Sequence, residues 1–303
     1  MLDTKVTPQF ADVLDDFRTF LTERGITSEA AINHNDIQDY VLARRETHDD
    51  VMYLITAIKE YFIAVKNDVL SNEFWLFEGG IWHFEQLSEH TKRELGDDVW
   101  EQVFADMPKT GATVDEITNF ARKMQEKLSK VAPKEQIECL VQKHAHGSRP
   151  IHNETHRKIL ETKGIDALLE HLQNEFIKEC EQAMLNDEEI FDYFKANPHC
   201  VRTGNKIINK QLPNFIKKYL HETDIKLKRY YGCHCEWKRK SILQDEGSLS
   251  GSLCYCCMAH CRHIFDAAFG QELKGRVVKS RMDDSEIECI FEYDIPKEWL
   301  DRV

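Results

Sequence analysis

The chain has 303 residues, which is long enough for two domains that each bury a core of their own. Apolar residues make up 42% and charged residues 31%, a composition typical of globular proteins and not of disordered or membrane-embedded ones. The net charge of −13 argues against sequence-independent nucleic-acid binding, because such binding uses Lys and Arg to neutralise phosphates. Neither nucleic acid nor a membrane is expected as a partner, since no apolar run reaches the ~18 residues of a membrane span.

The ten cysteines take their meaning from the compartment. The N-terminal sequence MLDTKVTPQFADVLDDF has neither the basic start nor the apolar stretch of a signal peptide, so we expect a cytoplasmic location. Thiols stay reduced there, and a disulfide framework is not expected. Metal binding, redox chemistry and simple burial remain as roles for these cysteines.

The first part of the sequence predicts helices. Apolar residues recur at helical spacing from 10 to 21 and from 51 to 65, with a shorter helix at 35–43. Over Thr7 to Phe77 this pattern resembles the small helical bundle at the front of tyrosine recombinases. Because the segment is acidic and no recombinase catalytic residues follow, we expect residues 1–107 to form a helical scaffold.

A break at 108–112 separates this bundle from the rest of the chain, where we expect a second domain at 113–303. Thr113 and Glu116 have the spacing of a capping box, which predicts the start of a helix. Further helices are expected at 134–144, 153–162 and 165–194.

The C-terminal part predicts a mixture of strands and one helix. The expected elements are a strand at 226–238, a helix at 253–269, a strand at 273–281, a turn at 282–285 and a strand at 287–295. The last strand is supported by apolar residues that alternate with Glu288, Glu292 and Asp294. The fold class expected is therefore α+β, with an all-helical bundle followed by an antiparallel α+β domain.

Two cysteine motifs lie in this second domain, Cys233-His-Cys235 and Cys254-Tyr-Cys256, with eighteen residues between them. On a strand, Cys233 and Cys235 would share a face. Cys254 would lie in the first turn of a helix, where the dipole favours a thiolate. The four sulfurs would suit zinc or an iron–sulfur centre, although the usual zinc motif is C-x2-C. A metal-free thiol site and plain burial remain alternatives.

A second group of candidate metal ligands is formed by histidines and one further cysteine. His152 and His156 are four residues apart on a predicted helix and would share a face. The other members are Cys139, His144, His146 and, beside Cys256 on its helix, His263. The alternative is that these histidines face solvent or bond within the core.

The stretch from Val201 to Lys240 holds eleven Lys/Arg and three Asp/Glu, a local charge of +8 in an acidic chain. Such a stretch could hold an anionic ligand, or it could pair with acidic helices of the same molecule. The residues we expect to bind a ligand are Lys206, Arg229, Tyr231, Trp237 and Tyr255, with Lys206, Arg229 or Tyr231 on the anionic group.

Three segments carry a resemblance to known families: Val201-Arg-Thr-Gly-Asn-Lys-Ile, Lys228-Arg-Tyr-Tyr-Gly-Cys-His-Cys-Glu-Trp237 and Leu253-Cys-Tyr-Cys256. They resemble a family of uncharacterised bacterial proteins with CHC and CYC motifs. The C-terminal half is similar to the 4-vinyl-reductase-type small-molecule-binding domain and to the aminothiazoline-carboxylate hydrolase-like family. In those groups a hairpin strand carries a cysteine and an aromatic residue, which Cys289 and Phe291 match. The resemblance implies a ligand pocket.

Three functions follow as hypotheses. The first is a sensor or regulatory protein that binds a small molecule or a metal in a cysteine-rich C-terminal pocket. The second is a hydrolase-like enzyme that uses Cys254 or Cys256 as nucleophile, or metal-activated water. The third is an interaction scaffold with structural cysteines. A homodimer is compatible with all three. The sequence contains no phosphate-binding Gly-rich loop, no dinucleotide fingerprint and no HExxH motif.

Overall fold

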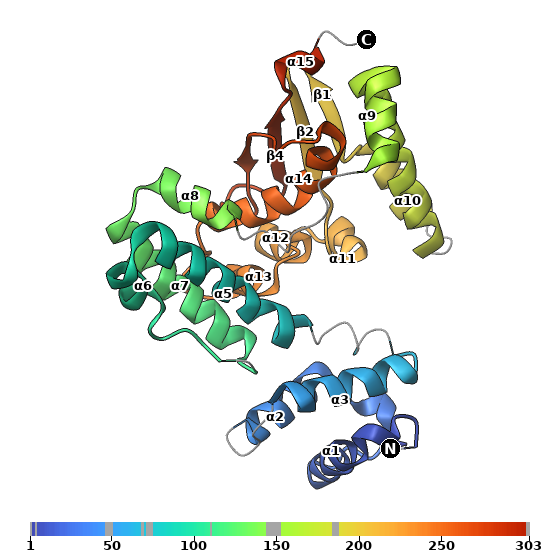
Figure 1. Ribbon diagram of the computed structural model, residues 1–303. Coiled ribbons are helices and arrows are strands. Elements are labelled where there is room, and N and C mark those ends of the chain that lie inside the picture. Colours follow the sequence, from blue (N-terminus) through green and yellow to red (C-terminus); the bar gives the residue numbers. More distant parts are fainter. Residues whose placement is uncertain are drawn as a thin grey trace.

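The computed structural model describes residues 2–3, 5–45, 51–67, 70, 75–109, 111–143, 153–183 and 188–300. Figure 1 shows helices through most of the chain and a small sheet formed by its C-terminal part. The predicted α+β class, with a helical N-terminal part and an antiparallel C-terminal sheet, is confirmed. No helix within these ranges is long and apolar enough to cross a membrane.

The N-terminal helices form a bundle with its own core. They are η1 (Pro8–Phe10), α1 (Ala11–Glu23), η2 (Glu29–Ala31), α2 (His34–Arg44) and α3 (Val51–Ala64). The apolar faces predicted from spacing meet here, and Leu14, Phe17 and Phe62 are fully buried. Asp16 of α1 accepts hydrogen bonds from Tyr40 and Arg44 of α2, which ties the two helices together.

The next helices form a second group: α5 (Trp75–Leu95), α6 (Asp97–Phe104), α7 (Val114–Val131) and α8 (Lys134–Lys143). The predicted capping box at the start of α7 is present, because Thr113 and Glu116 each bond the other's backbone N–H. Among described residues, the buried side chains of α5 and α6 pack with those of α7 and α8, and the change of core falls between Leu70 and Phe84. Arg45 donates two hydrogen bonds to Glu116, which joins α7 to the N-terminal bundle.

A long helix, α9 (Glu154–Ala183), is broken by a kink and is followed by α10 (Glu188–Ala196). The kink is at Gly164, whose φ of 83° and ψ of −177° are not helical. That combination is open almost only to glycine, because a Cβ would clash with the backbone. The break agrees with the sequence, which predicts separate helices ending at 162 and starting at 165.

The sheet contains four antiparallel strands in the order β1-β2-β4-β3. They are β1 (Cys200–Thr203), β2 (Lys206–Gln211), β3 (Gly275–Lys279) and β4 (Cys289–Asp294). The strands expected at 273–281 and 287–295 are thus confirmed. Phe291 and Tyr293 of β4 are fully buried in a core that the described parts of α9 and α14 (Tyr255–Phe269) share.

The strand predicted at 226–238 is wrong. The segment forms α12 (Ile225–Gly232) and the start of α13 (Glu236–Leu243), after a short α11 (Ile216–His221). Asp224 caps α12 by accepting from the Leu227 N–H, and α13 packs against α7. The paired tyrosines and alternating cysteines favour a strand, but capping and helix packing override that preference. Strands β1 and β2 were not predicted; β2 pairs with β4, and β1 forms the edge of the sheet on that side. Two short elements complete the fold, η4 (Gly251–Cys254) and α15 (Lys297–Leu300).

Candidate functional site

The side chain of Lys238 lies at the centre of the cysteine-rich region. It extends from α13 into the core and is fully buried. Its Nζ donates to the Leu253 carbonyl oxygen at 2.6 Å and lies 3.0 Å from Cys256 Sγ and 3.7 Å from Cys257 Sγ. An ammonium has three donors. Each donor therefore has an acceptor from the η4–α14 junction.

The side chains that contact this amine are those of Cys256 and Cys257. Burial disfavours the ammonium, but the negative charge of neighbouring thiol groups, Cys256 first, outweighs burial and raises the pKa of Lys238 well above its ordinary value. No carboxylate of the described chain forms an ion pair with Lys238, whose bonding partners are the three just named. A buried charge needs a counter-charge. Cys256, whose sulfur is the nearest to Nζ, would supply it as a thiolate.

A neutral alternative exists for Cys256. As a thiol it donates to the Leu253 carbonyl oxygen, 3.2 Å away. That arrangement would leave the ammonium of Lys238 without a counter-charge, which costs several kcal/mol in a protein interior, about 3–5 when one partner of a buried pair is removed. The 3.0 Å distance between Lys238 Nζ and Cys256 Sγ is that of a charge-assisted contact and is compatible with the ion pair.

The remaining thiols of this region are neutral at physiological pH. The thiolate expected at Cys254 is not supported, since burial raises the pKa of Cys254 to about 12. Its Sγ lies 3.2 Å from Ser280 Oγ inside the core, where desolvation outweighs the effect of the helix end. Burial also raises the pKa values of Cys233 and Cys235. The pKa of Cys257 is raised by its hydrogen bond with Cys256 and by burial.

Of the four cysteines predicted as a metal site, Cys256 contacts the amine of Lys238. The charge of Lys238 acts on Cys233, Cys235 and Cys254 as well as on Cys256. They do not share a strand face, because Cys233 ends α12 and Cys235 begins α13.

A zinc or iron–sulfur centre at these cysteines stays a prediction. In the ranges that the structure describes, the group of three ligand atoms within 4.8 Å of one another is elsewhere and contains no cysteine. A metal ion would also have to displace the ammonium from Cys256. We therefore derive no chemistry from a metal at these four sulfurs.

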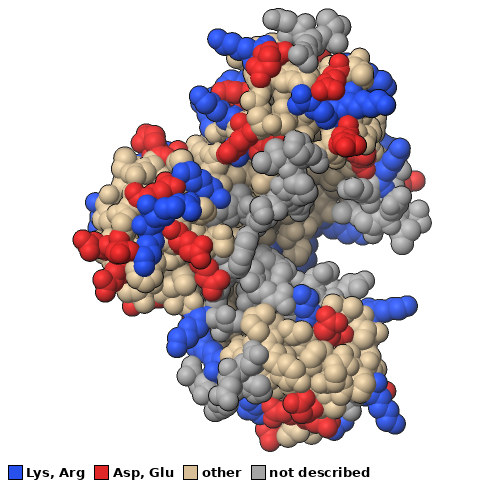
Figure 2. All heavy atoms as spheres, in the orientation of Figure 1, with Lys and Arg blue, Asp and Glu red and all other residues tan. Residues whose placement is uncertain are grey.

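The basic stretch is largely paired within the molecule. Lys206 forms ion pairs with Asp294 and Glu292, and buried Arg229 donates to Asp284 at 2.6 Å and to the Arg281 carbonyl oxygen at 2.8 Å. Figure 2 shows Lys and Arg interspersed with Asp and Glu over the described parts of the face it presents.

The three aromatic candidates lie in different surroundings. Trp237 is buried with its ring 5.2 Å from that of Phe84. Tyr231 is half-buried, with Lys218 Nζ 5.5 Å from its ring centroid. Tyr255 is half-buried on α14, where burial and Glu138 raise its pKa. Trp237 and Tyr255 pack against the same core as Cys254 and Cys256, whereas Tyr231 contacts Lys218 and Phe215.

The histidine group is divided by the structure. Residues His144, His146 and His152 lie outside the described residues, and Cys139 is exposed on α8. His263 is half-buried on α14, with a buried Nε2 that makes no hydrogen bond. His156 is buried on α9 and meets two residues not predicted as ligands, His171 and Glu175.

Sequence reasoning missed Lys238, His171 and Glu175. For His171 and Glu175 a signal was present, because they are four residues apart on a predicted helix and so share a face. For Lys238 none was available, since a lysine between Trp237 and Arg239 looks like one more charge on a basic surface.

No protein-family model matches the chain, and no curated protein or solved structure matches it. The resemblances drawn from the CHC and CYC motifs therefore stay predictions.

Proposed function

We propose that this protein is a regulatory sensor of thiol-reactive small molecules, with Cys256 as the reacting thiolate and Lys238 as its counter-ion. The observation that supports the proposal is the 3.0 Å distance between Cys256 Sγ and Nζ of a fully buried lysine. A thiolate, and not a thiol, is the nucleophile in cysteine chemistry, and an adjacent cation favours it. A cytoplasmic location would keep the thiols reduced, and every described cysteine is free.

The reaction with a peroxide illustrates the chemistry. Cys256 Sγ attacks one peroxide oxygen, the O–O bond breaks, and the leaving oxygen takes a proton from the Lys238 ammonium. Cys256 becomes a sulfenic acid, the peroxide is reduced to water or an alcohol, and Lys238 becomes a neutral amine. Burial of Cys256 restricts the reaction to small reagents. An ion pair between α13 and α14 is lost in the same step.

The loss of this ion pair can affect the N-terminal helices through packed contacts. Trp237, next to Lys238, is fixed to α7 by a 2.9 Å hydrogen bond from Thr118 Oγ1 to its carbonyl oxygen. The first turn of α7 contains Glu116, which accepts hydrogen bonds from Arg45 at 2.8 and 2.9 Å. A shift of α13 would therefore bear on the contact that joins the N-terminal bundle to α7. In this proposal the bundle presents the regulatory surface.

Pulsed alkylation of the folded protein with iodoacetamide, followed by mass spectrometry of each cysteine, tests the proposal. We expect Cys256 to be modified faster than Cys254, which is buried to the same degree but neutral. In Lys238→Met the ratio of the two rates should fall about tenfold or more, because the thiolate loses its cation. Using the ratio corrects for any general loosening of the core.

The matched control is Lys240→Met, which removes a partly exposed lysine from the same helix. Its Cys256 to Cys254 ratio should equal that of the wild type. Alkylation of Cys256 only after unfolding, or an unchanged ratio in Lys238→Met, would show that the proposal is wrong.

A further inference from the structure

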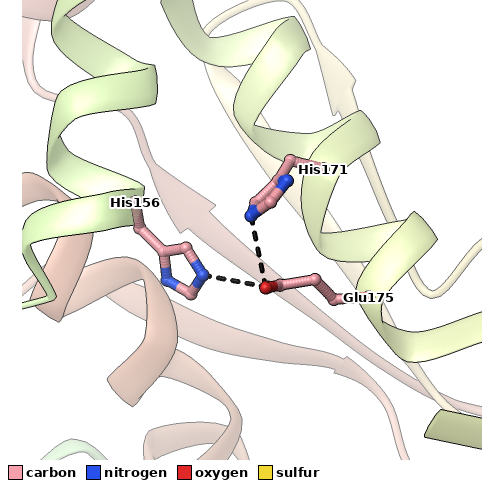
Figure 3. A group of neighbouring side chains, drawn as sticks. All are labelled: His156, His171 and Glu175. Carbon is pink, nitrogen blue, oxygen red and sulfur yellow. Dashed lines mark hydrogen bonds and ion pairs between the residues drawn. The ribbon is translucent and has the colours of Figure 1, made fainter. Parts of the chain in front are cut away.

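Three side chains of α9 converge outside the cysteine-rich region (Figure 3). His156 Nε2 lies 3.0 Å from Glu175 Oε2, and His171 Nε2 lies 3.3 Å from Glu175 Oε1. One ligand atom from each residue lies within 4.8 Å of the other two. Figure 3 shows both rings pointing a nitrogen toward the same carboxylate from two separate helical segments.

The kink at Gly164 makes this convergence possible. His171 and Glu175 are one helical turn apart on the second segment and share its face, while His156 lies in the first segment. The non-helical backbone of Gly164 folds the two segments against each other. His156 is held in place because its backbone N–H bonds to Asn153 Oδ1. The three groups therefore rest on a backbone that is fixed on both sides of the kink.

The nitrogens at this cluster are not fully used by the protein. His156 Nδ1 and His171 Nε2 are buried and make no hydrogen bond with any described group. His171 Nε2 is close to Glu175, yet it lacks the alignment of a hydrogen bond. His156 Nε2 does bond to Glu175 Oε2. The two unpartnered nitrogens remain, and a buried polar atom without a partner is costly, so a bound cation would satisfy what the protein leaves open.

The distances agree with those of a metal centre. Ligands bound to zinc at about 2.1 Å in tetrahedral geometry lie about 3.4 Å from one another. The His–Glu separations of 3.0 and 3.3 Å are already near that value. Two imidazoles and one carboxylate are also a ligand set that zinc and related divalent ions prefer.

We propose that His156, His171 and Glu175 bind one divalent transition-metal ion, such as zinc, across the kink of α9. His156 is almost completely buried, whereas the side chains of His171 and Glu175 are 33% and 46% exposed, so the ion has access from solvent. Three protein ligands leave a position for water or an added ligand. The ion would hold the two segments of α9 together. This metal site does not depend on the chemistry proposed for Cys256.

Titration of chelator-treated, reduced protein with Co²⁺ tests the site, because cobalt substitutes for zinc and reports its ligands in the absorption spectrum. We expect one equivalent to bind with visible d–d bands and without the strong near-ultraviolet band of a cobalt–thiolate bond. Zn²⁺ should displace it. In His171→Ala, affinity should fall by more than the about 10–100-fold that loss of an outer-shell partner costs. Glu175→Gln, which keeps its size, should behave alike.

His221→Ala is the matched control, because it removes a histidine–glutamate pair of similar length, 3.2 Å to Glu189, that has no third ligand among the described residues. Its Co²⁺ affinity should be unchanged. Circular dichroism checks that each variant is folded. Failure of the wild type to bind one equivalent, a thiolate band in its spectrum, or equal affinity in His171→Ala and wild type would overturn the proposal.

Discussion

The Lys238 cluster and the His156 cluster balance charge in opposite ways. At Lys238 a cation is already part of the protein, fully buried, and each donor of its ammonium has an acceptor. At His156 two ring nitrogens face one carboxylate, and two nitrogens of the cluster lack hydrogen bonds among the described groups. The first cluster needs no added ion, whereas the second has ring nitrogens that are available to bind one.

This difference shows why residue types alone do not identify a metal site. Cysteines at Cys233, Cys235, Cys254 and Cys256 are good ligands in composition, but an amine from α13 takes the place of the ion. The histidine cluster is sparser in the sequence, yet its atoms lie at ligand distances. The following experiments test the contrast between the two clusters.

The largest effect is expected from Cys256→Ala. It leaves the Lys238 ammonium buried without a counter-charge, which should lower the free energy of unfolding by about 3–5 kcal/mol. Lys238→Met should cost less, because Cys256 can then stay a neutral thiol. Urea denaturation at neutral pH measures both.

The double variant Lys238→Met/Cys256→Ala is the control for this pair. Because it removes both charges together, it should be more stable than Cys256→Ala alone. Additive losses would mean that Lys238 and Cys256 do not form an ion pair, and the contrast between the clusters would then disappear.

Metal binding should act on α9 and not on α13. A ligand at 100 times its dissociation constant stabilises the state that binds it by about 2.7 kcal/mol, which corresponds to about 100-fold slower opening of the bound region. Amide hydrogen exchange with and without Zn²⁺ should therefore slow around Gly164 and stay unchanged in α13. Slowing confined to α13 and α14 would instead place the ion among the cysteines.

Mild acid should destabilise the part of α9 that follows Gly164. Burial lowers the pKa of His199 from about 6.5 to about 4, and its Nδ1 lies 2.6 Å from Gln173 Oε1 on α9. As the pH falls, His199 is protonated near pH 6.5 in the unfolded chain but only near pH 4 in the folded protein. The free energy of unfolding is therefore highest above pH 6.5 and falls as the pH drops toward 4. The loss should be on the order of 2 kcal/mol in urea denaturation, after allowance for partial exposure.

The variant His199→Gln should flatten this pH dependence, because it has no group that titrates in the same window. His221→Ala should leave it in place, since His221 is exposed. An equal slope in wild type and His199→Gln would assign the acid sensitivity to other groups.

The smallest effect is expected at the kink. Gly164→Ala places a Cβ in a backbone conformation that glycine almost alone adopts, which should cost about 1–2 kcal/mol. Because His156 and Glu175 lie on opposite sides of the kink, the Co²⁺ affinity of Gly164→Ala should also be lower than that of the wild type. Lys163→Ala, at the neighbouring exposed residue, should change neither quantity.

Much of the fold could be predicted because its signals are local. The apolar faces of α1 and α3, the capping box at Thr113 and the alternation along β4 each need only a few neighbouring residues. The helices at 225–243 were missed because their cysteines and tyrosines favour a strand locally, while packing against α7 favours a helix.

The candidate sites were predicted less well for the same reason. Their location in the cysteine-rich segment, and the membership of His156, followed from residue types. The partners did not, because Lys238 meets Cys256 across eighteen residues and Glu175 meets His156 across nineteen. Such meetings depend on how helices pack.

The sequence by itself determined the helical start, the antiparallel end and the cysteine-rich character of the chain, since these follow from periodicity, turn chemistry and composition. Only the tertiary structure decided which charges lose water and what compensates them. Desolvation depends on the packing of distant segments, which buries Lys238 beside Cys256 and leaves His156 and His171 facing one carboxylate.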